Sequence, residues 1–171
     1  VFGCGPIGLL VLQVARAAGA ARLIATEKLP HRLEAARSLG ATVFQADDGR
    51  ESAAVLTITG GNGVAVAFEA TEENDAVETA IAATRPGGRV ILVGIPADDR
   101  TAFTASVARR KGLTIKLARR LKHAYPRAIR LVETGMVDVR SLVTDRFPLA
   151  RFHQAFSVAR KREGLKVLIE P

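Results

Sequence analysis

The sequence predicts an α/β fold in which helices cover both faces of a parallel sheet, the doubly wound arrangement, followed by a short α+β tail. Over residues 1–120, short runs rich in apolar and β-branched residues alternate with amphipathic segments. The runs at 64–69 and 89–94 are almost continuously apolar, which is typical of strands buried on both faces. Because parallel neighbours must be joined by a crossover, alternating strands and helices favour a parallel sheet.

The elements follow in order, and glycine or proline separates most of them. Strands are expected at residues 1–2, 22–26, 41–45, 64–69, 89–94 and 113–117. Helices are expected at residues 7–18, 31–39, 51–58, 74–84 and 104–110. Gly19, Gly40 and Gly112 follow three of these helices, and glycine commonly ends a helix. Turns are expected at 60–63 (Gly-Gly-Asn-Gly) and at 85–88 (Arg-Pro-Gly-Gly).

The alternation stops near residue 120. The remaining chain is expected to form helices at 125–134 and 149–160 and strands at 142–147 and 165–169. This pattern is a short α+β tail that does not continue the sheet. We therefore expect one domain over residues 1–121 and a separate segment over residues 122–171.

Length and composition exclude several classes of protein. The chain has 171 residues, 48% of them hydrophobic, which is enough for one domain with a core. A single cysteine excludes an internal disulfide and a multi-cysteine zinc cluster. The longest apolar run, 7–12, is too short to span a membrane, and the charged region of a signal peptide is missing. We expect a cytoplasmic protein with no membrane partner.

The net charge of +8 raises the question of a nucleic-acid partner. Residues 1–99 carry a net charge of −4, and residues 100–171 carry +12. The basic residues of the second part are spread among apolar ones, and the chain has one Tyr and no Trp for stacking on bases. We expect a solvated face, or a surface that meets an acidic partner domain, rather than a nucleic-acid site.

The motif that carries chemistry is Gly3-Cys4-Gly5-Pro6-Ile7-Gly8, which has the pattern G-x-G-x-x-G. Apolar strand residues precede it and a helix follows directly, as in the dinucleotide-binding form of this fold, the Rossmann fold. In that loop Gly3 allows the tight turn, Gly5 lets the backbone approach a diphosphate, and Gly8 permits close packing of the helix on a strand. The diphosphate would then meet the free N–H groups at the start of the helix.

Glu27 supplies the second half of the pattern. It ends the second expected strand, 19 residues after Gly8, where a carboxylate can accept hydrogen bonds from the adenosine ribose. The same carboxylate would repel a 2′-phosphate, which favours NAD over NADP. Lys28 and Arg32 lie close by in sequence and could each pair with a phosphate. The alternative for Glu27 is a solvated residue at the end of a strand.

The other reactive residue types do not form a catalytic pattern. Cys4 is expected to be a small packing residue rather than a nucleophile. The three histidines lack metal-ligand spacing, so no metal ligand and no catalytic residue is expected in this chain. Two basic clusters stand out, 109–111 and 119–122. The first is expected to be a solvated helix end, whereas the second follows the last sheet strand and could face a ligand.

Beyond these local signals, nearly the whole chain resembles the second half of zinc-dependent medium-chain alcohol dehydrogenases, most closely their sorbitol and threonine dehydrogenase branch. The segments that carry the resemblance are the glycine loop, 32–36, 39–41, 68–71, 86–88, 93–96, 142–149 and 164–167. The resemblance implies that this chain binds NAD and that the full enzyme transfers hydride between a secondary alcohol or polyol and nicotinamide. It also implies a homo-oligomer joined through the strand at 113–117.

Several residue roles follow from the resemblance alone. Residues of the glycine loop would hold the diphosphate, namely Gly3, Gly5, Pro6, Ile7 and Gly8. Glu27 and Arg32 would bind and flank the adenosine ribose. Val93, Gly94 and Ile95 would line the nicotinamide through backbone groups. Ala118, Arg119 and Arg120 would border the nicotinamide and the substrate, and Arg120 matches the arginine that contacts the polyol.

Two positions depart from the family pattern. Leu121 replaces an aromatic residue, which puts polyol specificity in question, and Glu72 replaces a frequent glycine. In this family cysteine, histidine and glutamate ligands hold the catalytic zinc in an N-terminal domain, and this chain contains no such domain. We therefore expect a fragment whose tail, 122–171, belongs to that catalytic domain, and which has no dehydrogenase turnover alone.

Three alternatives stay open. One is a zinc-free, NADPH-dependent quinone or enone reductase of the same superfamily, which Glu27 argues against. A second is a methyltransferase, which the continuation Pro6-Ile7-Gly8 and the tail disfavour. The third is a non-enzymatic nucleotide sensor or nucleic-acid-binding module that uses the basic second half.

Overall fold

The computed structural model describes residues 1–46, 49–120 and 123–171. The chain divides into two compact units, Val1–Lys122 and His123–Pro171. The boundary expected between residues 121 and 122 lies outside the described residues.

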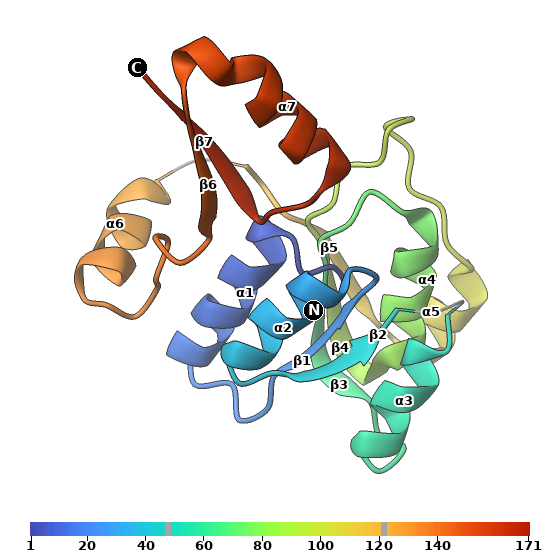
Figure 1. Cartoon of the computed structure of the whole chain (residues 1–171). Helices are drawn as coiled ribbons and strands as arrows, with labels where there is room; N and C mark the ends of the chain where they lie inside the picture. The colour runs from blue at the N-terminus through green and yellow to red at the C-terminus, as the bar shows by residue number, and fades with distance from the viewer. Residues whose placement is uncertain (47–48, 121–122) are drawn as a thin grey trace. The chain divides into compact units, whose positions relative to one another are not determined.

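The first unit is built on a parallel sheet (Figure 1). The strands that pair side by side are β1 (Ile24–Glu27) with β2 (Thr42–Gln45), and β3 (Val64–Glu69), β4 (Thr84–Leu92) and β5 (Thr114–Leu117) in that order. Phe2 joins the two groups, because it forms parallel bridges to Thr26 on one side and to Glu69 on the other. The continuous order is therefore β2, β1, Phe2, β3, β4, β5, which confirms the predicted doubly wound parallel sheet.

In the described part of this unit, five helices connect these strands. They are α1 (Pro6–Ala17), α2 (Pro30–Ser38), α3 (Glu51–Ile58), α4 (Asn74–Ala83) and α5 (Ala105–Lys111). Helix α1 packs beside α2, whereas α4 packs beside both α3 and α5 (Figure 1). The chain passes from Phe2 through α1 to β1, and through α2 to β2 at one edge of the sheet. Helix α3 then leads back to β3, and α4 and α5 lead on to β4 and β5. Right-handed crossovers therefore place the two groups on opposite faces of the sheet.

The core lies mainly between the sheet and the α3–α5 layer. Its fully buried side chains include Val55 of α3, Ile81 of α4 and Val90 of β4. On the other face, Leu9 and Leu12 of α1 are fully buried. These apolar faces fix α1 with its first turn at the carboxyl edge of the sheet.

The turn predicted at residues 85–88 is wrong as a separate element. The structure has one strand, β4, from Thr84 to Leu92, and Thr84 already pairs with Val64. Pairing resumes at Val66 and Arg89, so the intervening Arg-Pro-Gly-Gly residues form a bulge within the strand. Gly87 has φ +69°, and a β-carbon on Gly88 would lie 2.8 Å from the Arg85 carbonyl oxygen. The turn residues therefore bend the strand without ending it.

The second unit contains α6 (Tyr125–Glu133), β6 (Val143–Pro148), the 3₁₀ turn η1 (Leu149–Arg151), α7 (Phe152–Lys161) and β7 (Lys166–Glu170). Strands β6 and β7 pair in parallel, joined by α7. The single helix predicted at 149–160 is wrong at its start, because the chain leaves β6 at Pro148 through a 3₁₀ turn, a common form of helix entry. Helix α6 has no buried residue, and Ile129 and Val132 on it are exposed.

Candidate dinucleotide site

The glycine loop connects Phe2 to α1 at the carboxyl edge of the sheet. Gly3 has φ +92°, a conformation that L side chains rarely adopt. A β-carbon there would lie 2.6 Å from Thr71 Cγ2 and 2.9 Å from the Ala70 carbonyl oxygen. Both the backbone conformation and the space therefore require glycine at this position.

The other two glycines of the loop have opposite surroundings. A β-carbon on Gly8 would overlap the carbonyl oxygen of Gly3, so α1 approaches the loop backbone closely. A β-carbon on Gly5 would meet only Arg32 Nη1, at 3.6 Å. The backbone at Gly5 is thus open on one side, which is what a close-fitting diphosphate needs.

The first turn of α1 is free to receive an anion. Gly5 is the N-cap and offers no side-chain cap, Pro6 begins the helix, and the first turn has no acidic residue. The early N–H groups of a helix lack partners within the helix, and the helix dipole adds positive potential at this end. The residues present therefore fit the diphosphate of a dinucleotide.

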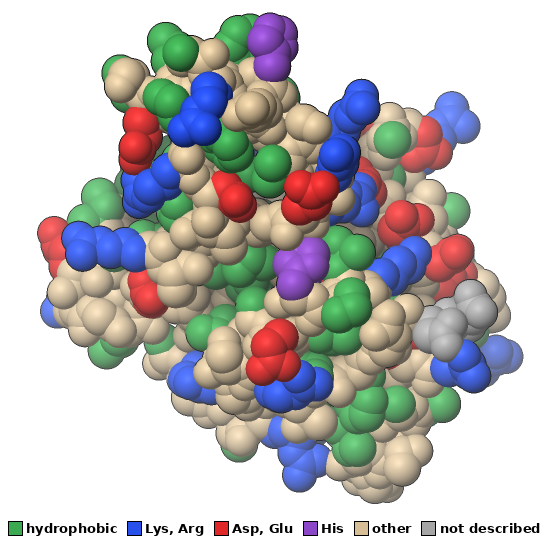
Figure 2. Space-filling view, viewed as in Figure 1, with side chains coloured by type: hydrophobic (Ala, Val, Ile, Leu, Met, Phe, Trp, Pro, Cys, Tyr) green, Lys and Arg blue, Asp and Glu red, His purple; other side chains and the backbone are tan. Residues whose placement is uncertain are grey.

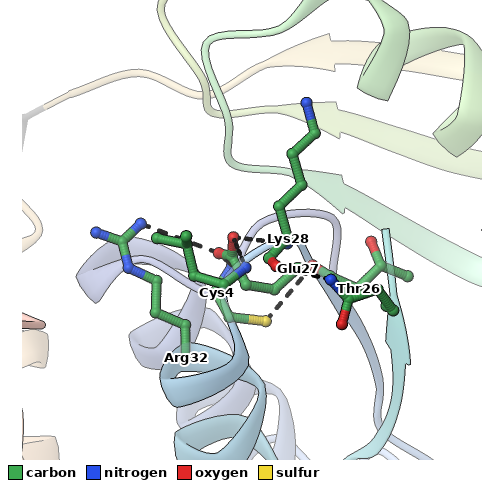
Figure 3. A network of polar contacts seen from close by, with 7 residues as sticks. Cys4, Thr26, Glu27, Lys28 and Arg32 are labelled. Carbon is green, nitrogen blue, oxygen red and sulfur yellow. Dashed lines mark hydrogen bonds and ion pairs between the residues drawn. The ribbon is translucent and has the colours of Figure 1, made fainter. Parts of the chain in front are cut away.

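Glu27 lies at the end of β1, buried beside the glycine loop (Figure 3). Its Oε2 accepts the N–H of Cys4 at 2.8 Å, and its Oε1 accepts the N–H groups of Lys28 at 2.8 Å and Leu29 at 3.1 Å. The carboxylate thus fixes the loop on one side and the start of α2 on the other. Glu27 is therefore not a solvated residue at the end of a strand but a buried hydrogen-bond acceptor held in one orientation.

Arg32, in the first turn of α2, completes this half of the site. Its Nη1 lies 4.0 Å from Glu27 Oε2, and the two side chains are 15% and 10% exposed. Its Nε is buried without a hydrogen-bond partner, the one such side-chain atom among the described residues. A buried donor without a partner costs free energy, so a bound group with an acceptor would stabilise this side chain.

A second cluster joins the ends of β3 and β4. Glu69, the last residue of β3, is 3% exposed and accepts hydrogen bonds from Thr71 and Gly94. A β-carbon on Gly94 would overlap the Thr71 carbonyl oxygen. Thr71 therefore touches both Gly3 and Gly94, two residues that the sequence assigned to different ends of the cofactor. Thr71 could not be assigned a role from the sequence, because a threonine after a strand carries no distinctive pattern.

The remaining predicted residues follow β4 and β5. Val93 and Gly94 are half-buried at the end of β4, and Ile95 is 66% exposed. The N–H of Ala118 donates to the Leu92 carbonyl at 2.8 Å, so Ala118 lies beside the end of β4. Arg119 and Arg120 come next and are exposed. Leu121 lies outside the described residues.

Cys4 is a packing residue, as the sequence predicted. It is fully buried, and its Sγ lies 3.6 Å from the Thr26 carbonyl oxygen (Figure 3). Burial, followed by the nearby Glu27 carboxylate, raises the pKa of the Cys4 thiol to about 12. The thiol therefore stays protonated and is a poor nucleophile.

Metal binding and membrane insertion have no matching features in the described parts of the chain. No three His, Cys, Asp or Glu side chains gather there as a metal site, so the described residues do not fit a zinc ion. None of the described helices is long and apolar enough to cross a bilayer. On the face in Figure 2, Lys and Arg side chains are dispersed among acidic and apolar ones.

Comparison with known proteins decides the family. Residues 6–134 match the family model described as zinc-binding dehydrogenase, which covers α1 through α6. The chain belongs to the zinc-binding dehydrogenase family. This confirms the resemblance to zinc-dependent dehydrogenases, and Glu27 and Glu69 lie within the matched residues.

Individual members of the family are similar over the whole chain. An L-threonine 3-dehydrogenase of Bacillus velezensis is 33% identical over 174 residues, and a sorbitol dehydrogenase of Bacillus subtilis is 34% identical over 176. The crystal structure of 2R,3R-butanediol dehydrogenase from Bacillus subtilis matches with a TM-score of 0.88 at 31% identity, over 99% of this chain. The chain spans about half the length of each: 50%, 49% and 49%.

Proposed function

We propose that this chain is the NAD-binding portion of an alcohol or polyol dehydrogenase of the zinc-binding family. The observation that carries the proposal is the buried Glu27 carboxylate, held by the N–H of Cys4 within the glycine loop. That bond joins the two parts of the dinucleotide pattern into one site.

The binding roles follow the geometry. The N–H groups at the start of α1, opened at Gly5, hold the diphosphate. Glu27 accepts hydrogen bonds from the adenosine ribose hydroxyls, and Arg32 flanks the ribose on the same side. The segment 93–95 lines the nicotinamide, and Arg119 and Arg120 border the substrate. Bound nicotinamide supplies the hydride chemistry, while this chain binds and orients it.

Glu27 also supports NAD over NADP. A buried carboxylate at the ribose position repels a 2′-phosphate, and its hydrogen bonds to three backbone N–H groups keep it in place. An NADPH-dependent reductase would have a small or basic residue here. Arg32, whose Nη1 lies 4.0 Å from Glu27 Oε2, could pair with a phosphate at this position once Glu27 is neutralised.

The experiment is a titration of the 171-residue chain with NADH and NADPH. Because the chain has no Trp, nicotinamide fluorescence can be followed with little protein background. We expect saturable NADH binding that is tighter than NADPH binding. In Glu27→Gln the preference for NADH should fall about tenfold, equivalent to about 1.4 kcal/mol.

Glu34→Gln is the matched control. It removes one carboxylate from the same helix region, but Glu34 is exposed and pairs with Arg37 on the surface. Its NADH preference should equal that of the unaltered chain. Absence of NADH binding at millimolar concentration, or an unchanged preference in Glu27→Gln, would contradict the proposal.

We further propose that the tail, 122–171, belongs to the catalytic domain and that the chain alone turns over no alcohol. Homo-oligomerisation through β5 is part of the same proposal. Strand β5 is at the edge of the sheet, and Leu117 on it is 75% exposed. Unpaired edge strands readily add another strand. Light scattering of Leu117→Lys against the unaltered chain tests this, and equal masses would contradict it.

A further inference from the structure

We infer that Glu69 and Thr71 are positioning residues that fix the 93–95 segment against the glycine loop, so that the nicotinamide end of the cofactor is held at a set distance from the diphosphate end. The inference rests on the proposed function and deepens it. Neither residue needs to contact the cofactor, because both act through the backbone that does.

Glu69 ties three backbone N–H groups to one residue. The Oε1 of Glu69 accepts two hydrogen bonds from Thr71, one from the N–H at 2.5 Å and one from the hydroxyl at 2.8 Å. The Oε2 of Glu69 accepts the N–H of Gly94 at 3.3 Å. Its own carbonyl oxygen accepts the N–H groups of Val93 at 2.8 Å and Gly94 at 3.1 Å. The chain leaving β4 is therefore attached to the end of β3 at successive residues.

The surroundings make this attachment specific for a carboxylate. Glu69 is 3% exposed, and within the described chain its partners are backbone N–H groups and one hydroxyl. A buried carboxylate is tolerated only when hydrogen bonds replace its hydration. An amide in its place would turn one acceptor into a donor that faces another donor.

Thr71 transmits the position of this cluster to the glycine loop. Its Cγ2 would lie 2.6 Å from a β-carbon on Gly3, and its carbonyl oxygen would overlap a β-carbon on Gly94. The same residue thus packs on the diphosphate loop and on the nicotinamide segment. Its hydroxyl also accepts the N–H of Glu73 at 3.0 Å, which fixes its rotamer.

A dinucleotide must span both segments, although they follow different strands of the sheet. When the separation of the two segments is already set in the free protein, less conformational entropy is lost as the second end of the cofactor binds after the first. When the attachment is loosened, the adenosine diphosphate end keeps its own contacts at Gly5 and Glu27. The loss should therefore fall on the nicotinamide end alone.

The test compares NADH with ADP-ribose, which lacks the nicotinamide, on the 171-residue chain. In Glu69→Gln and Thr71→Val, we expect NADH affinity to fall about tenfold while ADP-ribose affinity stays within about twofold. The fluorescence gain of bound NADH should fall as well, since the ring is less ordered. Thr71→Ser keeps the hydroxyl but loses the methyl group that packs on Gly3, so its NADH affinity should lie between those of Thr71→Val and the unaltered chain. This pair carries the test if Glu69→Gln does not fold.

Glu78 and Thr104 provide the matched control. Glu78 Oε1 accepts the N–H of Thr104 at 2.5 Å and its hydroxyl at 2.8 Å, the same contacts, but they hold the start of α5. Glu78→Gln and Thr104→Val should change neither affinity. Equal losses for both ligands in the Glu69 and Thr71 variants, or no loss, would overturn the positioning role alone. Absence of NADH binding by the unaltered chain would overturn the proposed function itself.

Discussion

The carbonyl oxygen of Gly3 occupies the space that a β-carbon on Gly8 would need. Helix α1 can therefore lie against the loop only while residue 8 has no side chain. We predict that Gly8→Ala destabilises the chain by about 1–3 kcal/mol, because a backbone carbonyl cannot rotate away as a side chain can. Urea unfolding followed by circular dichroism measures the change.

Gly5→Ala is the counterpart of that substitution. A methyl group there meets only Arg32 Nη1 at 3.6 Å, and Gly5 has an ordinary φ of −64°. The stability should change by less than about 1 kcal/mol, while NADH binding weakens because the methyl group faces the diphosphate. Equal unfolding free energies for both alanine variants would contradict this account of the loop.

Burial of Cys4 predicts a pH dependence of stability. The pKa of the thiol is about 12 in the folded chain, against 9.0 for an ordinary thiol. Between these values the unfolded chain loses the proton and the folded chain keeps it, so stability falls as pH rises above about 9. At pH 10.5 the loss from this group should be about 2 kcal/mol. The unfolding free energy of Cys4→Ala should fall less between pH 7.5 and 10.5, and parallel curves would refute the assignment.

Lys111, the last residue of α5, caps the C-terminal end of α4. Its ammonium group donates to the carbonyl oxygens of Ile81 at 3.1 Å, Ala82 at 2.6 Å and Thr84 at 2.9 Å. Lys111→Met should cost about 1–3 kcal/mol, because these carbonyls lose their charged donor. Arg110→Met, an exposed neighbour on α5, should cost only a few tenths of a kcal/mol. Thermal unfolding of both variants would show whether the two costs differ.

Arg32 should matter more for binding than for folding. Its Nε has no partner, its ion pair is 4.0 Å long, and Glu27 keeps three backbone donors without it. We predict that Arg32→Met changes the unfolding free energy by less than about 1 kcal/mol but lowers NADH affinity at least about threefold. Calorimetric titration measures the affinity. A large stability loss with unchanged affinity would mean that Arg32 is structural.

Much of the sheet and half of the site could be predicted from the sequence. Helix α3 and strand β3 have the predicted bounds, because glycines and a clear change of pattern enclose them. The glycine loop and Glu27 could be found because their spacing along the chain is fixed by one crossover. The bulge at residues 85–88 could not, since Pro and Gly favour a turn and only the pairing of Thr84 with Val64 shows that the strand has already begun.

The cluster of Glu69 and Thr71 also could not be predicted from the sequence. Glu69 could be placed at a strand end, but its bonds go to Gly94, 25 residues away. Such contacts depend on which strands become neighbours and on how far each extends. The partnership of Arg32 with Glu27 likewise depends on the rotation of α2 about its axis, which spacing alone does not set.

Phe2 connects the two halves of the sheet, because it bridges to Thr26 on one side and to Glu69 on the other. Its N–H donates to the Phe68 carbonyl and its carbonyl accepts the N–H of Ala70. On the opposite side the Gly3 N–H donates to the Thr26 carbonyl, and the Thr26 N–H donates to the Val1 carbonyl. In the described chain no other residue pairs with both β1 and β3. Hydrogen exchange at the Thr26 and Ala70 amides should therefore report a common opening event. A cofactor bound to the glycine loop, which directly follows Phe2, would slow hydrogen exchange at both amides together. Binding would thus stabilise the pairing of both half-sheets with Phe2.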